Sequence, residues 1–200
     1  MRKNGTDDFA LLAELAALIG QSADALGRLL RSETTAETGK CLREEMRTLY
    51  RRLMARLERE FVPPMERRDL ADLGGKLFAL GEACAVAGAT LRETPRLAIS
   101  EGMGVIAATL AEAAQRLEEL IGLLPQFQKA SRFRPAIAEL LAQTAEADAL
   151  CAGEIGVLAA AGLAAGTTIA RYAAISRLRA AVQAFASAAE AVAEAAVNNG

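Results

Sequence analysis

The sequence predicts an all-α protein with six helices. The chain of 200 residues is 52% hydrophobic but only 4% aromatic, and alanine and leucine dominate it. This composition favours helices that pack closely through small side chains over a β-sandwich. Apolar residues also recur every three or four positions in successive segments, as they do in helices with one buried face. We therefore expect almost no β-strand.

Two adjacent prolines divide the first half of the chain. Pro63 and Pro64 forbid a continuous helix, because proline lacks a backbone N–H and displaces the preceding residue from the helical conformation. We expect a rigid corner there, in the segment Phe61–Leu70. Helices are predicted at residues 7–32, from a capping box at 34–37 to residue 60, and from the corner to residue 93.

Prolines and threonines also mark the helix starts of the second half. The predicted starts and stops are Thr94 and Pro95 for the beginning of the fourth helix, Pro125 for its end, Pro135 for the beginning of the fifth helix and Thr167 or Thr168 for the cap of the sixth. Residues 198–200 are expected to be a frayed tail. Short connections between the six helices predict two antiparallel three-helix bundles, residues 1–94 and 95–200, packed lengthwise in one domain spanning residues 1–200.

The composition excludes several classes of function. Histidine is absent, which removes Ser–His and Cys–His nucleophile systems and the commonest metal ligand. Cys41, Cys84 and Cys151 are odd in number and far apart, so neither a disulfide framework nor a thiolate zinc site is indicated, and a reducing compartment is expected. A net charge of −2 argues against binding of nucleic acid. We expect a protein that is not an enzyme.

No targeting or membrane-spanning segment is predicted. The first eight residues are polar and lead into an amphipathic helix, unlike a signal peptide. The uncharged run from Ile155 to Ala170 is rich in alanine and glycine and is shorter than the roughly 20 apolar residues that a bilayer span needs. The expected location is therefore the cytoplasm, with a peripheral position at the inner face of the membrane as the alternative.

Three short motifs resemble those of a known family. The corner contains Phe61, Pro64 and the run Glu66-Arg67-Arg68-Asp69-Leu70, the fifth predicted helix contains Glu146-Ala147-Asp148, and the sixth contains Glu190. In these positions the chain is similar to the PhoU-like phosphate transport regulators, specifically their short cytoplasmic type. The resemblance spans nearly the whole chain. It implies six helices in two three-helix bundles, with carboxylates at four-residue spacing that hold iron- or zinc-like metal clusters.

The chain departs from the family at most of the implied metal ligands. The expected acids are replaced at Arg43, Arg47, Phe78, Ala79, Thr144, Gln183 and Ser187. A metal cluster needs several anionic oxygens, and arginine beside it adds repulsion. We therefore expect no cofactor. Glu45 is left on the second helix, and Glu82, Asp148 and Glu190 are the candidate residual ligands. A single ion held by Asp148 and Glu190 is the alternative hypothesis.

Arg43, Arg47 and Arg51 form a stripe at four-residue spacing on the second predicted helix. Guanidinium groups suit phosphate or carboxylate, so the stripe is a candidate anion site. Neighbouring glutamates also allow an ordinary solvated face of mixed charge. A third interpretation buries Arg47 and pairs it with Asp148 or Glu82, as an ionic substitute for a lost metal.

Two functions follow as expectations. The resemblance implies a non-enzymatic regulator of inorganic phosphate uptake that contacts a phosphate transporter or a signalling protein at the cytoplasmic face of the membrane, with a homodimer left open. The alternative is a carboxylate metal-binding helical bundle that retains one iron- or zinc-like ion through Asp148 and Glu190.

Overall fold

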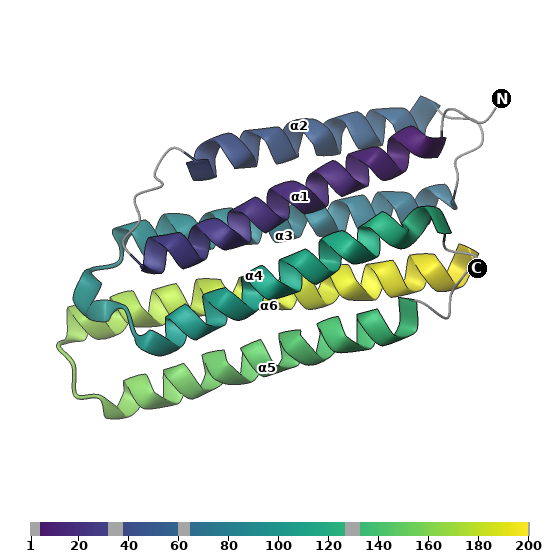
Figure 1. Ribbon diagram of the computed structural model, residues 1–200. Helices are drawn as coiled ribbons and strands as arrows, with labels where there is room; N and C mark the ends of the chain where they lie inside the picture. Colours follow the sequence, from purple (N-terminus) through teal and green to yellow (C-terminus); the bar gives the residue numbers. More distant parts are fainter. Residues whose placement is uncertain (1–4, 32–37, 60–64, 127–132, 200) are drawn as a thin grey trace.

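The computed structural model describes residues 5–31, 38–59, 65–126 and 133–199 (Figure 1). In these ranges the chain is helical and contains no β-strand. The α-helices are α1 (Gly5–Leu30), α2 (Thr38–Arg59), α3 (Arg67–Glu93), α4 (Glu101–Leu123), α5 (Phe133–Ala160) and α6 (Ala165–Asn199), and two short 3-10 helices are η1 (Arg96–Ala98) and η2 (Leu124–Gln126). The all-α class and the number of helices are confirmed.

Four long helices form the centre of the molecule and two cover it. The helix α3 packs extensively against α6, and α1 packs extensively against α4, so each of these central pairs contains one helix from each half of the chain. The helix α2 contacts α1 and α3 on one side, and α5 contacts α4 and α6 on the other. Figure 1 shows α2 and α5 at opposite edges of the bundle. The hydrophobic core therefore runs between the two halves as well as within them.

The predicted apolar faces explain this core. The apolar residues that recur every three or four positions on α4 and α6 are buried. On α5 this recurrence is interrupted by the polar residues Thr144 and Asp148. Thr144 is buried and donates its hydroxyl to the carbonyl oxygen of Leu141, while Asp148 is half-buried. The inward residues of α6 are Ile175, Leu178, Val182, Phe185, Ala189, Val192 and Ala196.

Several predicted helix boundaries are wrong. Thr94 and Pro95 do not start the fourth helix, because Thr94 is the C-cap of α3 and the 3-10 helix η1 intervenes before α4. The helix α4 ends at Leu123, two residues before Pro125, and α5 begins at Phe133, two residues before Pro135. Thr168 is not the cap of α6, since it already bonds back to Ala164 inside the first turn. The predicted end of the third helix at Glu93 is confirmed, whereas the cap signals of the later helices lie within a few residues of the observed ends.

The predicted frayed tail is wrong for Asn198 and Asn199, because α6 continues to Asn199. The side chain of Asn199 accepts a hydrogen bond from the backbone N–H of Glu66 at 2.8 Å and donates to Asp69 at 2.7 Å. Asn199 thereby satisfies a donor at the start of α3. The last turn of α6 is fixed against the first turn of α3. Residues 61–64 of the predicted corner lie outside the described part of the chain. The predicted capping box at 34–37 lies outside it as well.

Two helices are long and apolar enough to cross a membrane by length and composition alone, within residues 7–30 and 165–199. The uncharged run of residues 155–170 overlaps the second of these helices but is not itself a candidate span. Half of each window is buried inside the protein, and core helices of soluble proteins pass the same test. Their apolar faces are used by the packing of α1 against α4 and of α6 against α3 and α5.

Candidate functional site

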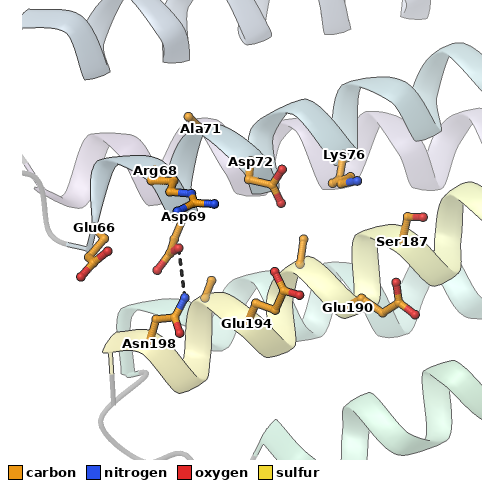
Figure 2. A pocket seen from close by; sticks show the side chains of 12 residues that line it. Glu66, Arg68, Asp69, Ala71, Asp72, Lys76, Ser187, Glu190, Glu194 and Asn198 are labelled. Atoms are coloured by element: carbon orange, nitrogen blue, oxygen red, sulfur yellow. Dashed lines mark hydrogen bonds between the residues drawn. The ribbon is translucent and has the colours of Figure 1, made fainter.

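An open cleft of about 660 Å³ lies between the first half of α3 and the last third of α6 (Figure 2). Five of its lining residues are acidic and two are basic. The polar and charged residues around it are Glu66, Arg68, Asp69, Asp72, Lys76, Ser187, Glu190, Glu194 and Asn198. We call this feature the acidic cleft.

Helical spacing brings these acids to the cleft. Glu190 and Glu194 are four residues apart on α6, so they lie on the same side of that helix, and Asp69 and Asp72 are three apart on α3. Asp69 accepts hydrogen bonds from Asn198 at 3.2 Å and from Asn199 at 2.7 Å, which tie the two helices together. Figure 2 shows the carboxylates of Glu190 and Glu194 on the α6 side of the cleft. This arrangement suits lysine and arginine side chains of a partner.

Glu82, one of the three acids predicted to hold a metal, is paired with arginine. The Nε atom of Arg43 on α2 lies 2.8 Å from Oε1 of Glu82, and a second nitrogen of Arg43 contacts the other carboxylate oxygen. The Nη2 atom of Arg47 lies 3.7 Å from Glu82. Hydrogen bonds from Arg43 lower the pKa of Glu82 below its usual range. Two guanidinium groups therefore stand where a cation would be needed.

Asp148 is paired in the same way in the other half of the chain. The guanidinium group of Arg179 on α6 donates two hydrogen bonds to the carboxylate, of 2.7 and 2.8 Å. These bonds lower the pKa of Asp148. Glu190, the third predicted metal ligand, is exposed and lines the acidic cleft. In the described residues, no group of three or more histidine, cysteine, aspartate or glutamate side chains has a geometry that can hold a metal ion.

The other implied metal positions also lack ligands. Phe78 on α3 stacks on Tyr50 of α2, with ring centroids 4.8 Å apart and planes inclined by 11°. Thr144 turns its hydroxyl to the backbone of its own helix. The residues at these positions therefore do not fit the clustered metals that the resemblance implies.

The arginine stripe of α2 is used unevenly. Arg43 holds Glu82 and Arg47 holds Glu44 at 3.1 Å, while Arg51 is exposed. The hypothesis that Arg47 is buried is wrong, because a third of its side chain is exposed. Its pairing with Glu82 is present but longer than that of Arg43. The stripe combines the ionic substitution expected for Arg47 with the mixed-charge face of an ordinary helix.

The two buried thiols do not provide a nucleophile. Burial raises the pKa of Cys84 to about 12 and that of Cys151 to about 11. Both thiols are therefore protonated at neutral pH. Since only the thiolate is reactive, the two side chains act as core residues. Cys41 is exposed, and its hydrogen bond to Glu45 raises its pKa as well.

Sequence reasoning missed one buried ion pair. Asp8 is fully buried near the N-terminus of α1, and the Nε atom of Arg56 on α2 lies 2.8 Å from its Oδ1. A second nitrogen of Arg56 lies 3.4 Å from Asp7. The pair of adjacent aspartates indicated only a favourable helix start. Helical spacing is the signal that could have found the buried aspartate, because Asp8 precedes the buried residues Leu12 and Leu15 by four and seven positions.

We expect Asp148→Asn to lower the free energy of unfolding by about 1 kcal/mol at pH 7, because it weakens a two-point contact that is partly exposed. The pKa of Asp148 is lowered in the folded protein, so the contribution is fully present above the ordinary carboxyl pKa of roughly 4 and is lost as the pH falls through the folded-state value. Urea denaturation at pH 7 and near pH 3 measures both effects. Glu146→Gln, at an exposed position of the same helix, is the control and should change neither.

Comparison of the sequence with protein-family models finds no match, and no curated protein matches it. The described residues define the class of protein: an all-α, six-helix protein that carries an open acidic cleft between α3 and α6.

Proposed function

We propose that the chain is a PhoU-like regulator of inorganic phosphate uptake that acts by protein contact and without catalysis. In this proposal, residues 1–94 and 95–200 are two antiparallel three-helix bundles packed lengthwise. The contact is made with a phosphate transporter or its signalling partner, in the cytoplasm or at the inner face of the membrane. Phosphate as the signal rests on the resemblance of the corner and of residues 146–148 to that family.

The acidic cleft is the observation that carries the proposed mode of action. It is open, it is lined by side chains from two helices, and its acids outnumber its bases. Charged groups in such a surface select and steer an oppositely charged partner. The partner segment is therefore expected to present lysine or arginine residues to Glu190 and Glu194.

The pairing of Glu82 with Arg43 and of Asp148 with Arg179 supports regulation without a metal. A guanidinium group that is bonded at two points compensates a carboxylate without further ligands. Elemental analysis of the purified protein tests this part of the proposal. Stoichiometric iron or zinc that Asp148→Asn removes would contradict it and would favour the metal-binding alternative.

We expect cells that lack this chain to regulate phosphate uptake abnormally, and we expect the wild-type chain to restore it. Glu190→Lys/Glu194→Lys should fail to do so, because it reverses the charge of one side of the acidic cleft. Uptake of labelled phosphate at low and high external phosphate is the measurement. Glu118→Lys/Glu119→Lys is the matched control, since these exposed acids lie on α4 outside the cleft.

A deca-lysine peptide tests the cleft separately from the phosphate signal. Its binding to the purified protein at low salt should weaken roughly tenfold in Glu190→Lys/Glu194→Lys and should change little in the α4 control. If the cleft variant binds the peptide as the wild type does, the cleft is not the contact surface. If peptide binding depends on the cleft but phosphate uptake does not respond to the chain, the phosphate assignment is wrong.

A further inference from the structure

Large exposed hydrophobic side chains gather at one end of the molecule. This end, which we call the apolar end, joins η1, the beginning of α4, the end of α5 and the beginning of α6, at the left of Figure 1. Five of the seven large exposed hydrophobic residues in the described chain are located there: Leu97 (84% exposed), Ile169 (68%), Val157 (61%), Tyr172 (53%) and Val105 (49%). Exposed apolar groups that cluster in this way mark an interaction surface.

Hydrogen bonds hold these segments together. Arg171 on α6 donates to the carbonyl oxygens of Ala98 at 2.9 Å and Leu97 at 3.2 Å. Arg96 donates to the carbonyl oxygen of Leu30 at the end of α1, at 2.9 Å. The exposed side chain of Leu97 is therefore carried on a backbone that is fixed to both α1 and α6. The surface is built into the fold.

The uncharged run from Ile155 to Ala170 extends this surface. The structure places it at the turn from α5 to α6, where Gly162 adopts a positive φ of 59°. Most of its residues are exposed, including Val157 and Ile169. The inward residues of α4 and α6 are uncharged because they are buried in the core. Burial does not explain why this exposed run lacks charge. A partner that covers this turn therefore contacts methyl groups and backbone atoms.

The charges around the apolar end are mainly positive. Among the described residues of the segments that meet there and of the adjoining ends of α1 and α3, basic residues outnumber acidic ones. Apart from Arg171, the basic residues are Arg28, Arg31, Arg92 and Arg96, and the acidic residues are Glu93, Glu101 and Glu154. Arg171 adds a further cation, whose bonds described above go to neutral carbonyl oxygens. A net positive rim around an exposed apolar centre complements an anionic lipid surface.

One acid, Glu154 near the end of α5, is bonded to the beginning of α4, which is itself part of the apolar end. Ser100, the N-cap of α4, donates its hydroxyl to Glu154. A Cβ atom at Gly102 would lie only 1.9 Å from Oε1 of Glu154, so glycine leaves the room that this carboxylate occupies. The negative charge of Glu154 is thus placed at the positive N-terminus of α4. Its field at the apolar end is reduced accordingly.

We propose that the apolar end binds the surface of an anionic lipid bilayer, with Leu97, Ile169 and Tyr172 entering the headgroup region and the surrounding arginines contacting lipid phosphates. Tyrosine favours such an interface because its ring is apolar and its hydroxyl is polar. About 20 residues of α6 separate Ile169 from Glu190, which is a distance of roughly 30 Å along the helix. A bilayer-bound molecule therefore holds the acidic cleft away from the membrane. This proposal does not depend on the phosphate assignment.

Vesicle flotation of the full chain tests the proposal. The protein should float with vesicles of phosphatidylcholine containing about one third phosphatidylglycerol, and binding to phosphatidylcholine alone should be several-fold weaker. Ile169→Asp should reduce binding to the anionic vesicles at least about tenfold, because it removes an apolar contact and adds a negative charge. An acid in the first turns of α6 is also compatible with the helix dipole, so this variant should fold, as circular dichroism will verify.

Val197→Asp is the matched control, because Val197 is an equally exposed residue of α6 (70%) at the opposite end of the helix. It should bind anionic vesicles as the wild type does. The proposal is overturned if the wild type does not float, if neutral and anionic vesicles bind equally, or if Ile169→Asp binds normally. A dimer in light scattering that Ile169→Asp dissolves, without vesicle binding by the wild type, would overturn it in favour of a second copy of the chain.

Discussion

Replacing Arg56 by methionine is expected to lower the free energy of unfolding by about 3 kcal/mol at pH 7. Arg56 bonds the carboxylate of Asp8, which is completely buried. Removing one member of a buried pair leaves the other charge without compensation, at a typical cost of about 3–5 kcal/mol. We expect the lower value, because a third of the Arg56 side chain is exposed and the N-terminus of α1 itself favours a negative charge.

A double-mutant cycle separates the charge from the packing. Asp8→Asn/Arg56→Met should recover a large part of the loss, since the uncompensated carboxylate is gone, and the coupling between the two positions should reach about 1–3 kcal/mol. Chemical denaturation gives all four stabilities. Arg59→Met, at an exposed position in the last turn of the same helix, should change stability by less than about 0.5 kcal/mol. An equally small effect of Arg56→Met would show that Asp8 does not need its partner.

The fold class followed from the sequence because the apolar spacing on each helix is read locally. The inward residues of α4 and α6 repeat every three or four positions without interruption, so burial could be assigned to each of them. Helix ends were less predictable. Threonine is a common N-cap and proline a common first helical residue, so Thr94 and Pro95 were expected to start the fourth helix. Thr94 is instead the C-cap of α3, and η1 connects α3 to α4. That connection arises only from packing.

The candidate site depended on which helices lie side by side. Glu190 was singled out only by the resemblance, as a possible metal ligand. The acidic cleft also requires Asp69 and Asp72, more than 100 residues earlier, and nothing in the sequence pairs α3 with α6. Asn199 was expected to be frayed for the same reason, because its partner Glu66 belongs to a distant helix. One of the three interpretations of the arginine stripe paired Arg47 with Asp148 or Glu82. Arg43 contacts Glu82 more closely than Arg47 does, and Asp148 is held by Arg179. Arg43 and Arg47 are four residues apart on α2, so both lie on the same face of that helix and either can reach Glu82.

Phe185 is the second position where a large effect is expected. Its ring is completely buried on α6, the helix that packs against α3, α4 and α5. Phe185→Ala removes the ring and leaves a cavity that these helices can close only in part. The expected cost is about 3–5 kcal/mol, which corresponds to a fall in melting temperature of roughly 10 °C for a chain of this size.

Phe78→Ala is the matched control for Phe185→Ala, because the chemical change is identical and the burial is not. Phe78 is half-buried and stacks on Tyr50, so its loss should cost about 1–2 kcal/mol. Thermal and urea unfolding of both variants measure the difference. If the two substitutions lower the free energy of unfolding equally, Phe185→Ala leaves no larger cavity than Phe78→Ala. The packing of α6 against its neighbours would then not be tighter than the packing at the edge of the protein.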